Sequence, residues 1–185
     1  GAVCQNPVSL LGFGVLPGAV HPFLVTISTI LTTIALLLVG VIADRSRHPQ
    51  WWLGALAWVG AAAASAMFFL SGDNWQLGAV LMIVANLCIG SSQVIYDGIL
   101  VRIASPDDRD RVSSRGWAWG YLGGGLLLAL NLVVMTAYEP LGISYGMAIR
   151  LSLLSAGLWW GVFTIIPVLG LRSLPQRTLA EVTHS

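Results

Sequence analysis

The sequence predicts an all-α membrane protein with five transmembrane helices. Its 185 residues are 56% hydrophobic and only 9% charged, whereas soluble domains are nearer about 25% charged. The apolar residues form long runs, and a transmembrane helix needs about 20 of them in succession. The charged residues lie mainly between these runs, most densely from Arg102 to Arg115. Because one charge at the bilayer centre costs about 2.5–3.5 kcal/mol, the charged breaks predict aqueous loops between spans.

Residues 1–21 are predicted to form an extracytoplasmic leader loop. The apolar stretch 10–20 has only 11 residues, which is too short to cross a bilayer as a helix. The chain begins with Gly1 rather than Met, so we expect a fragment of a longer protein. Cys4 and Cys88 lie far apart in unlike settings, which predicts neither a disulfide framework nor a metal site.

The first two spans are expected at about 22–43 and 51–70, with the polar segment 44–50 between them. Trp51 and Trp52 open the second span, and paired tryptophans suit a membrane interface. The small-residue tract from Gly60 to Ser65 predicts that another helix approaches this span closely. The short turn at 71–74 makes the second and third spans antiparallel neighbours.

The third span, at about 75–101, is the most polar. Asn86, Gly90, Gln93 and Asp97 are spaced at 4, 3 and 4 residues, which places them on one helix face. The fourth and fifth spans are expected at about 116–137 and 145–171. Residues 172–185 are predicted to start a cytoplasmic linker.

The arginines predict the orientation of the bundle. With five antiparallel spans, the loops at 44–50 and 102–115 and the tail after 171 share one side of the membrane. Eight of the nine arginines fall on that side, and the positive-inside rule makes it cytoplasmic. The eight are Arg45, Arg47, Arg102, Arg109, Arg111, Arg115, Arg172 and Arg177.

The segment Gly40-Val-Ile-Ala-Asp44-Arg45-Ser-Arg47 resembles the cytoplasmic loop signature of the major facilitator superfamily of transporters. The second glycine and the last basic positions of that signature are missing here. The resemblance implies a gating role for Gly40, Asp44, Arg45 and Arg47, in which an ion-pair network forms in one conformation and breaks in another. The alternative is that Asp44 and Arg45 only end the helix and anchor it at the headgroups.

A longer resemblance covers about residues 90–132 and is most specific from Arg109 to Gly125. These residues are similar to the branch of that superfamily with the vacuolar amino-acid effluxers linked to autophagy and their bacterial relatives. The resemblance implies that the five spans belong to a six-helix N-terminal bundle whose first helix is absent. It implies as partners that first helix, the C-terminal bundle of the same transporter and the lipid bilayer.

Gly116, Gly120, Gly124 and Gly125 are predicted helix-packing residues. The first three repeat every four residues on one face, so two backbones could pack closely there. The run is also similar to a glycine motif of superfamily antiporters, but Tyr121 stands where that motif has proline. Close packing and a direct mechanistic role both remain open.

Asp97 is the sharpest candidate for chemistry, because an acid inside a span is a functional hypothesis by default. It could carry a proton or form an ion pair at a cytoplasmic gate that also includes Arg102, Arg109 and Arg111. Asn86 and Gln93 lie deeper on the same face. They form a candidate substrate face or, alternatively, hydrogen-bond between helices.

We therefore expect part of a secondary active transporter of small polar solutes, amino acids or similar, working by alternating access, with the proton as a candidate coupling ion. The alternative is a non-transporting membrane scaffold that holds partners on its glycine faces. No nucleophile–base pair or metal cluster is visible, so we expect neither an enzyme nor a cofactor. The net charge of +1 gives no basic field for nucleic acid. The expected location is a bacterial plasma membrane.

Overall fold

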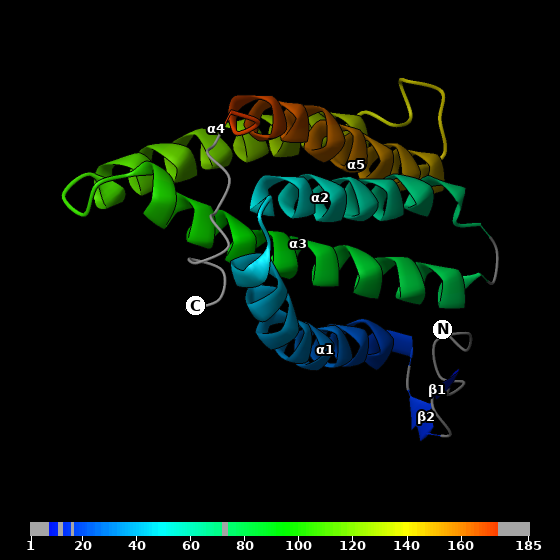
Figure 1. The fold of residues 1–185 in the computed structure, drawn as a ribbon. Coiled ribbons are helices and arrows are strands. Elements are labelled where there is room, and N and C mark those ends of the chain that lie inside the picture. Colours follow the sequence, from blue (N-terminus) through cyan, green and yellow to red (C-terminus); the bar gives the residue numbers. More distant parts are fainter. Residues whose placement is uncertain (1–7, 11–12, 16, 72–73, 174–185) are drawn as a thin grey trace.

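The computed structural model describes residues 8–10, 13–15, 17–71 and 74–173, and within them it forms a helical bundle (Figure 1). Five helices are each long and apolar enough to cross a membrane, which confirms the predicted all-α membrane fold. The elements are β1 (Val8–Leu10), β2 (Phe13–Val15), α1 (Pro17–Arg45), α2 (Pro49–Ala66), the short 3-10 helix η1 (Met67–Phe69), α3 (Trp75–Ile103), α4 (Arg109–Thr136) and α5 (Tyr145–Gly170).

The helices form an ordered stack. Figure 1 shows α3 between α1 and α2, and α2 between α3 and α5, in agreement with the contacts between these helices. Short turns connect α1 to α2 and α3 to α4, so the C-terminal ends of α1, α3 and α5 lie at one end of the bundle. Leu171, just after α5, packs there against a cluster that contains Ala43, Ile95 and Ile99. We call it the arginine-rich end, because Arg45, Arg47, Arg102, Arg109, Arg111 and Arg172 lie in or beside its turns.

The N-terminal segment differs from the prediction in two ways. Strands β1 and β2 pair as an antiparallel hairpin, with Ser9 opposite Gly14, where we expected an irregular leader. Helix α1 begins at Pro17, inside the predicted leader, rather than near Pro22. Proline suits a first helical turn because the N–H that it lacks has no partner there. Pro22 is tolerated one turn later, and its carbonyl oxygen accepts a hydrogen bond from Thr26 Oγ1 at 2.9 Å.

The predicted charged loop is also shorter than expected. Helix α4 begins at Arg109 rather than Gly116, and α3 continues through Arg102 to Ile103, so only residues 104–108 connect them. The loop prediction assumed that a helix ends where its charges begin. Charges exclude a segment from hydrocarbon, but they do not prevent it from being helical in water. Asp110 in the first turn of α4 also complements the helix dipole.

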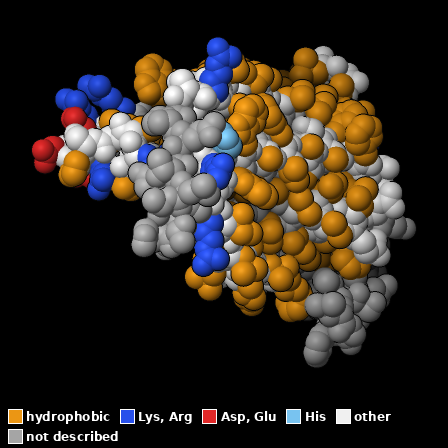
Figure 2. All heavy atoms as spheres, in the orientation of Figure 1, with side chains coloured by type: hydrophobic (Ala, Val, Ile, Leu, Met, Phe, Trp, Pro, Cys, Tyr) orange, Lys and Arg blue, Asp and Glu red, His pale blue; other side chains and the backbone are white. Residues whose placement is uncertain are grey.

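Many large apolar side chains of the bundle face outward, and most of the buried apolar side chains are small, with Ile95 and Ile99 among the larger exceptions. Figure 2 shows apolar side chains over most of the right half of the visible face, whereas the Lys and Arg side chains lie from the left edge to the middle of the view. Leu37 and Trp119 are each 73% exposed, whereas Ala148 is 0% exposed. Outward-facing apolar side chains suit lipid as the solvent, and small residues between helices allow close packing.

The small-residue tract of α2 packs closely against α5, as predicted. A Cβ atom added at Gly157 of α5 would lie 2.5 Å from the backbone nitrogen of Ser65 and 2.8 Å from the carbonyl oxygen of Ala61. One added at Gly60 would lie 2.8 Å from Cβ of Cys88 on α3. The tract is thus in contact with a helix on each side.

Candidate functional site: polar residues of α3 and the groove beside it

The polar residues of α3 face different neighbours. Asn86 is half-buried, and its Nδ2 donates a hydrogen bond to Ser28 Oγ on α1 at 3.4 Å. One turn later α1 crosses against Gly90, where an added Cβ would lie 2.5 Å from Cγ2 of Thr32. Contact with α1 then continues to Val94, whose Cγ1 would lie 3.8 Å from a Cβ at Gly40. The α1 contact therefore follows the row of every fourth residue along α3.

Gln93 and Asp97 lie beside that row and not on it. Gln93 Nε2 donates to Asp97 Oδ1 at 3.3 Å, which joins the two side chains along one helix. Gln93 is half-buried and lines a groove toward α4 and α5, whereas Asp97 is exposed. Asn86 thus forms a hydrogen bond between α3 and α1, whereas Gln93 is the residue of the predicted substrate face that lines the groove.

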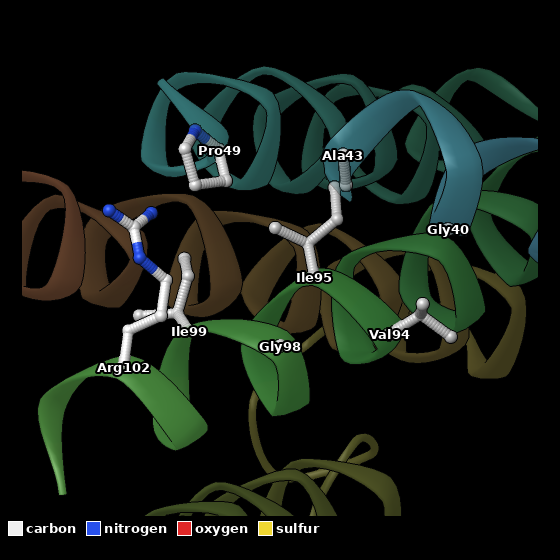
Figure 3. Close-up of a pocket in the computed structure, with 8 residues that line it drawn as sticks. All are labelled: Gly40, Ala43, Pro49, Val94, Ile95, Gly98, Ile99 and Arg102. Carbon is white, nitrogen blue, oxygen red and sulfur yellow. The ribbon is translucent and has the colours of Figure 1, made fainter. Parts of the chain in front are cut away.

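Two of the predicted gate residues border one small cavity at the arginine-rich end. The cavity has a volume of about 130 Å³ and lies among α1, the start of α2 and the last turns of α3 (Figure 3). Arg102 is half-buried, and its side chain extends toward Pro49 in Figure 3. Arg45 and Arg47 are exposed, and the side chain of Asp44 lies outside the described part of the chain. The cavity is lined by Gly40, Ala43, Pro49, Val94, Ile95, Gly98, Ile99 and Arg102.

The other predicted gate arginines hold the α3–α4 turn. Arg109 Nη2 donates to the carbonyl oxygen of Val101 at 3.3 Å and so reaches back to the end of α3. Arg111 Nη2 pairs with Asp108 Oδ1 at 2.8 Å, and Ser105 Oγ donates to Asp108 Oδ2 at 2.9 Å. The predicted gate residues are therefore divided among the α1–α2 turn, the last turns of α3 and the start of α4, and two of them, Gly40 and Arg102, border the same cavity.

A much larger groove of about 870 Å³ runs among α3, α4 and α5. Helix α4 forms one wall, and none of its residues is buried. Gln93 and Tyr96 stand at one end, and the rest of the lining is apolar side chains and glycines. The lining residues are Gln93, Tyr96, Gly116, Trp117, Trp119, Gly120, Leu122, Gly123, Leu126, Trp159, Phe163, Ile166 and Pro167.

Of the four predicted packing glycines, one has a close neighbour. A Cβ added at Gly116 would lie 2.8 Å from Tyr96 Oη on α3. One added at Gly120, Gly124 or Gly125 would meet nothing within 4 Å in the described part of the chain. Close packing at these three positions stays a prediction.

Two interhelical hydrogen bonds were not expected from the sequence. Ser155 Oγ donates to Asn131 Oδ1 at 2.9 Å and joins α5 to α4. Trp58 Nε1 donates to the carbonyl oxygen of Gly161 at 3.2 Å and joins α2 to α5. Asn131 could have been found from the sequence, because it is a lone amide in an apolar stretch of the fourth span. No feature of the sequence indicates the hydrogen bond from Trp58 to Gly161.

The described residues contain no group of three or more His, Cys, Asp or Glu side chains that could hold a metal ion. Cys88, on α3, is a buried free thiol packed beside α2. The polar groups of this site are amides, hydroxyls, arginines and the carboxylates of Asp97 and Asp108. Such groups can bind and orient a polar solute or exchange ion pairs.

A stack of helices long and apolar enough to span a membrane, with polar side chains inside it, defines a polytopic membrane protein. Comparison with known families identifies the type. The family model described as "Vacuole effluxer Atg22 like" matches residues 4–108 and 101–185. The chain belongs to this Atg22-like family of major facilitator transporters.

Individual relatives agree with this assignment. The chain is 26% identical to the "Uncharacterized MFS-type transporter YxiO" of Bacillus subtilis (strain 168), over 77% of this chain and 34% of that protein. It is 22% identical to "Autophagy-related protein 22" of Pyricularia oryzae, over 98% of this chain and 34% of the relative. It is 23% identical to "Autophagy-related protein 22-1" of Penicillium rubens, over 84% of this chain and 36% of the relative. No solved structure gives a significant match. The chain spans about a third of the length of these relatives.

Proposed function

We propose that these residues are the N-terminal half, without its first helix, of a secondary active transporter that moves small polar solutes, amino acids or similar, by alternating access. The observation that carries the proposal is the Gln93–Asp97 pair beside the large groove. Gln93 Nε2 lies 3.3 Å from Asp97 Oδ1, at the polar end of an otherwise apolar lining. Amide and carboxylate groups are suited to the ammonium and carboxylate of an amino acid. The family assignment supports transport as the activity, and the name "Vacuole effluxer" supports export.

We further propose that the arginine-rich end is a cytoplasmic gate in a bacterial plasma membrane. The positive-inside rule supports this orientation, because most of the arginines lie in or beside the turns at 46–48 and 104–108 or just after α5. These are Arg45, Arg47, Arg102, Arg109, Arg111 and Arg172. Arg102 borders the small cavity and Arg109 bonds across the α3–α4 turn, so a movement of these helix ends would change the contacts of both. The bacterial relative supports the choice of membrane.

The substrate class is tested with the full-length transporter in liposomes. Vesicles are loaded with single radiolabelled amino acids, and efflux is followed with and without a proton gradient. We expect gradient-dependent movement of at least one amino acid, slowed by Gln93→Ala. If no amino acid moves faster than through empty liposomes, the proposed substrate class is wrong.

Asp97→Asn distinguishes a gate residue from a proton carrier. We expect Asp97 to act at the gate, because it lies just before the arginine-rich turn, so both driven transport and exchange between equal substrate pools should change. Exchange needs no net proton movement. Normal exchange with loss of driven transport alone would instead make Asp97 the proton carrier. Glu139→Gln is the matched control, since it removes an exposed carboxylate at the opposite end of the bundle and should change neither rate.

A further inference from the structure

We propose that the arginine-rich end carries a binding site for the phosphate headgroup of an anionic phospholipid. The site consists of three exposed arginines from the end of α1, the α1–α2 turn and the segment after α5, which are Arg45, Arg47 and Arg172. We call them the headgroup arginines. The proposal concerns the lipid around the bundle, so it goes beyond the proposed transport activity and holds whichever solute is transported.

The first support is the position of the headgroup arginines. Arg45 is in the last turn of α1, and Arg47 lies two residues before α2 begins. Arg172 directly follows Leu171, which packs against the cluster that contains Ala43 of α1, so the end of α5 lies at the same end of the bundle. Figure 2 shows arginine side chains, in blue, along the edge of the apolar surface. In a bilayer, headgroups meet hydrocarbon at such an edge.

The second support is a difference between two neighbouring groups of arginines. In the α3–α4 turn, Arg109 Nη2 donates to the carbonyl oxygen of Val101, and Arg111 pairs with Asp108. By contrast, the side chains of the headgroup arginines form neither an ion pair nor a hydrogen bond with any part of the chain that the structure describes. Their guanidinium groups therefore keep their donors for an outside anion, and the planar guanidinium fork is suited to phosphate.

The third support favours a lipid over a soluble anion or an acidic protein. Leu38, Ile42 and Arg45 are spaced at 4 and 3 residues, which places them on one face of α1. Leu38 is 63% and Ile42 48% exposed, so an open apolar face leads directly to the arginine. Trp51 and Trp52, 57% and 46% exposed, lie just after the turn, and tryptophans favour the headgroup level of a bilayer. A phospholipid uses both the apolar face and the cations, whereas a soluble anion uses the cations alone.

The first experiment is native mass spectrometry of the full-length transporter in detergent, titrated with phosphatidylglycerol or with phosphatidylcholine that has the same acyl chains. Arg45→Gln/Arg47→Gln removes two headgroup arginines, and Arg172→Gln removes the third. The matched control is Arg109→Gln/Arg111→Gln. It changes the net charge by the same amount at the same end of the bundle, but it removes arginines that are bonded within the protein.

We expect phosphatidylglycerol to bind about a hundredfold more tightly than phosphatidylcholine, because each arginine beside an anionic lipid contributes about fivefold. Arg45→Gln/Arg47→Gln should weaken phosphatidylglycerol binding about 25-fold and Arg172→Gln about fivefold, while the control double variant stays within about twofold of the parent. Equal binding of the two lipids, or an equal loss in the control variant, would overturn the proposal. Displacement of the lipid by an equal concentration of soluble glycerol phosphate would overturn it too, because the ligand would then be a soluble anion.

A second experiment leaves every arginine in place and therefore also applies if an arginine variant does not fold. The full-length transporter is reconstituted in phosphatidylcholine liposomes that contain a small fraction of lipid brominated near the headgroup, and tryptophan fluorescence is measured. Brominated phosphatidylglycerol should quench more than equally brominated phosphatidylcholine, and the excess should disappear in Trp51→Phe/Trp52→Phe. Equal quenching by the two lipids, or an excess that survives the tryptophan substitutions, would show that no anionic lipid is held at this site.

Discussion

Gly157→Ala should destabilise the bundle although it adds a single methyl group. The new Cβ would lie 2.5 Å from the backbone nitrogen of Ser65 and 2.8 Å from the carbonyl oxygen of Ala61. Both are backbone atoms of α2, so no side chain can rotate away, and α2 and α5 must separate. Overpacking of this kind costs about 1–3 kcal/mol. The better helix propensity of alanine offsets up to about 1 kcal/mol of that cost.

The expected net loss is about 1–2 kcal/mol, and about 1.4 kcal/mol is a tenfold change in an equilibrium constant. The measurement is the folded fraction of full-length protein in detergent, followed by size-exclusion chromatography after heating. Gly161→Ala is the matched control, since it lies one turn later on α5 and its Cβ would be at an ordinary 3.5 Å from Cβ of Ala61. This control should be as stable as the parent or slightly more so. Equal stability of the two variants would refute the close approach of α2 and α5.

Three further predictions concern topology, burial and a polar contact. In a protein otherwise free of cysteine, Ser71→Cys should react with an impermeant maleimide from outside and Ser105→Cys only after permeabilisation, and the reverse pattern would overturn the orientation. Native Cys88, 5% exposed, should react with a membrane-permeant maleimide only when the protein is unfolded, and rapid labelling of the folded protein would contradict its packing. Asn131→Ala and Ser155→Ala should each reduce stability by roughly 0.6 kcal/mol, as interhelical hydrogen bonds in membranes do on average. Their double variant should lose no more than either alone, whereas additive losses would show that the two side chains do not interact.

The positions of the spans followed from the sequence because hydrocarbon selects for apolar length. The ends of the helices did not, because a helix can continue beyond the membrane. Arg109 shows the difference: its charge excludes it from lipid, yet it begins α4 in water. The same is true near the N-terminus, where α1 begins at Pro17, inside the predicted leader. The hairpin of β1 and β2 has only three residues in each strand and no alternating pattern strong enough to predict it.

The sequence identifies candidate residues for the site, but it does not determine which helix each of them contacts. Helical spacing placed Asn86, Gln93 and Asp97 on one face, yet the row that contacts α1 diverges from the row that borders the groove. Glycines were harder still. The run at 116–125 was predicted to pack closely because its glycines repeat, whereas Gly157, which has the closer contacts, is repeated at that spacing only once, by Gly161 in the same apolar span. A glycine's role depends on the helix opposite it, and one sequence does not name that helix.

The reversed distribution of side-chain size has a consequence for engineering the bundle. Leu37, at 73% exposure, can change without disturbing a neighbour, whereas Ala148, at 0%, has no room for a larger side chain. A saturation mutagenesis map should therefore be the inverse of that of a soluble protein, with tolerant leucines and intolerant alanines. The same logic predicts that replacing outward-facing leucines with glutamate and lysine, while every internal glycine and alanine is kept, would convert this bundle into a water-soluble analogue with the same helix crossings.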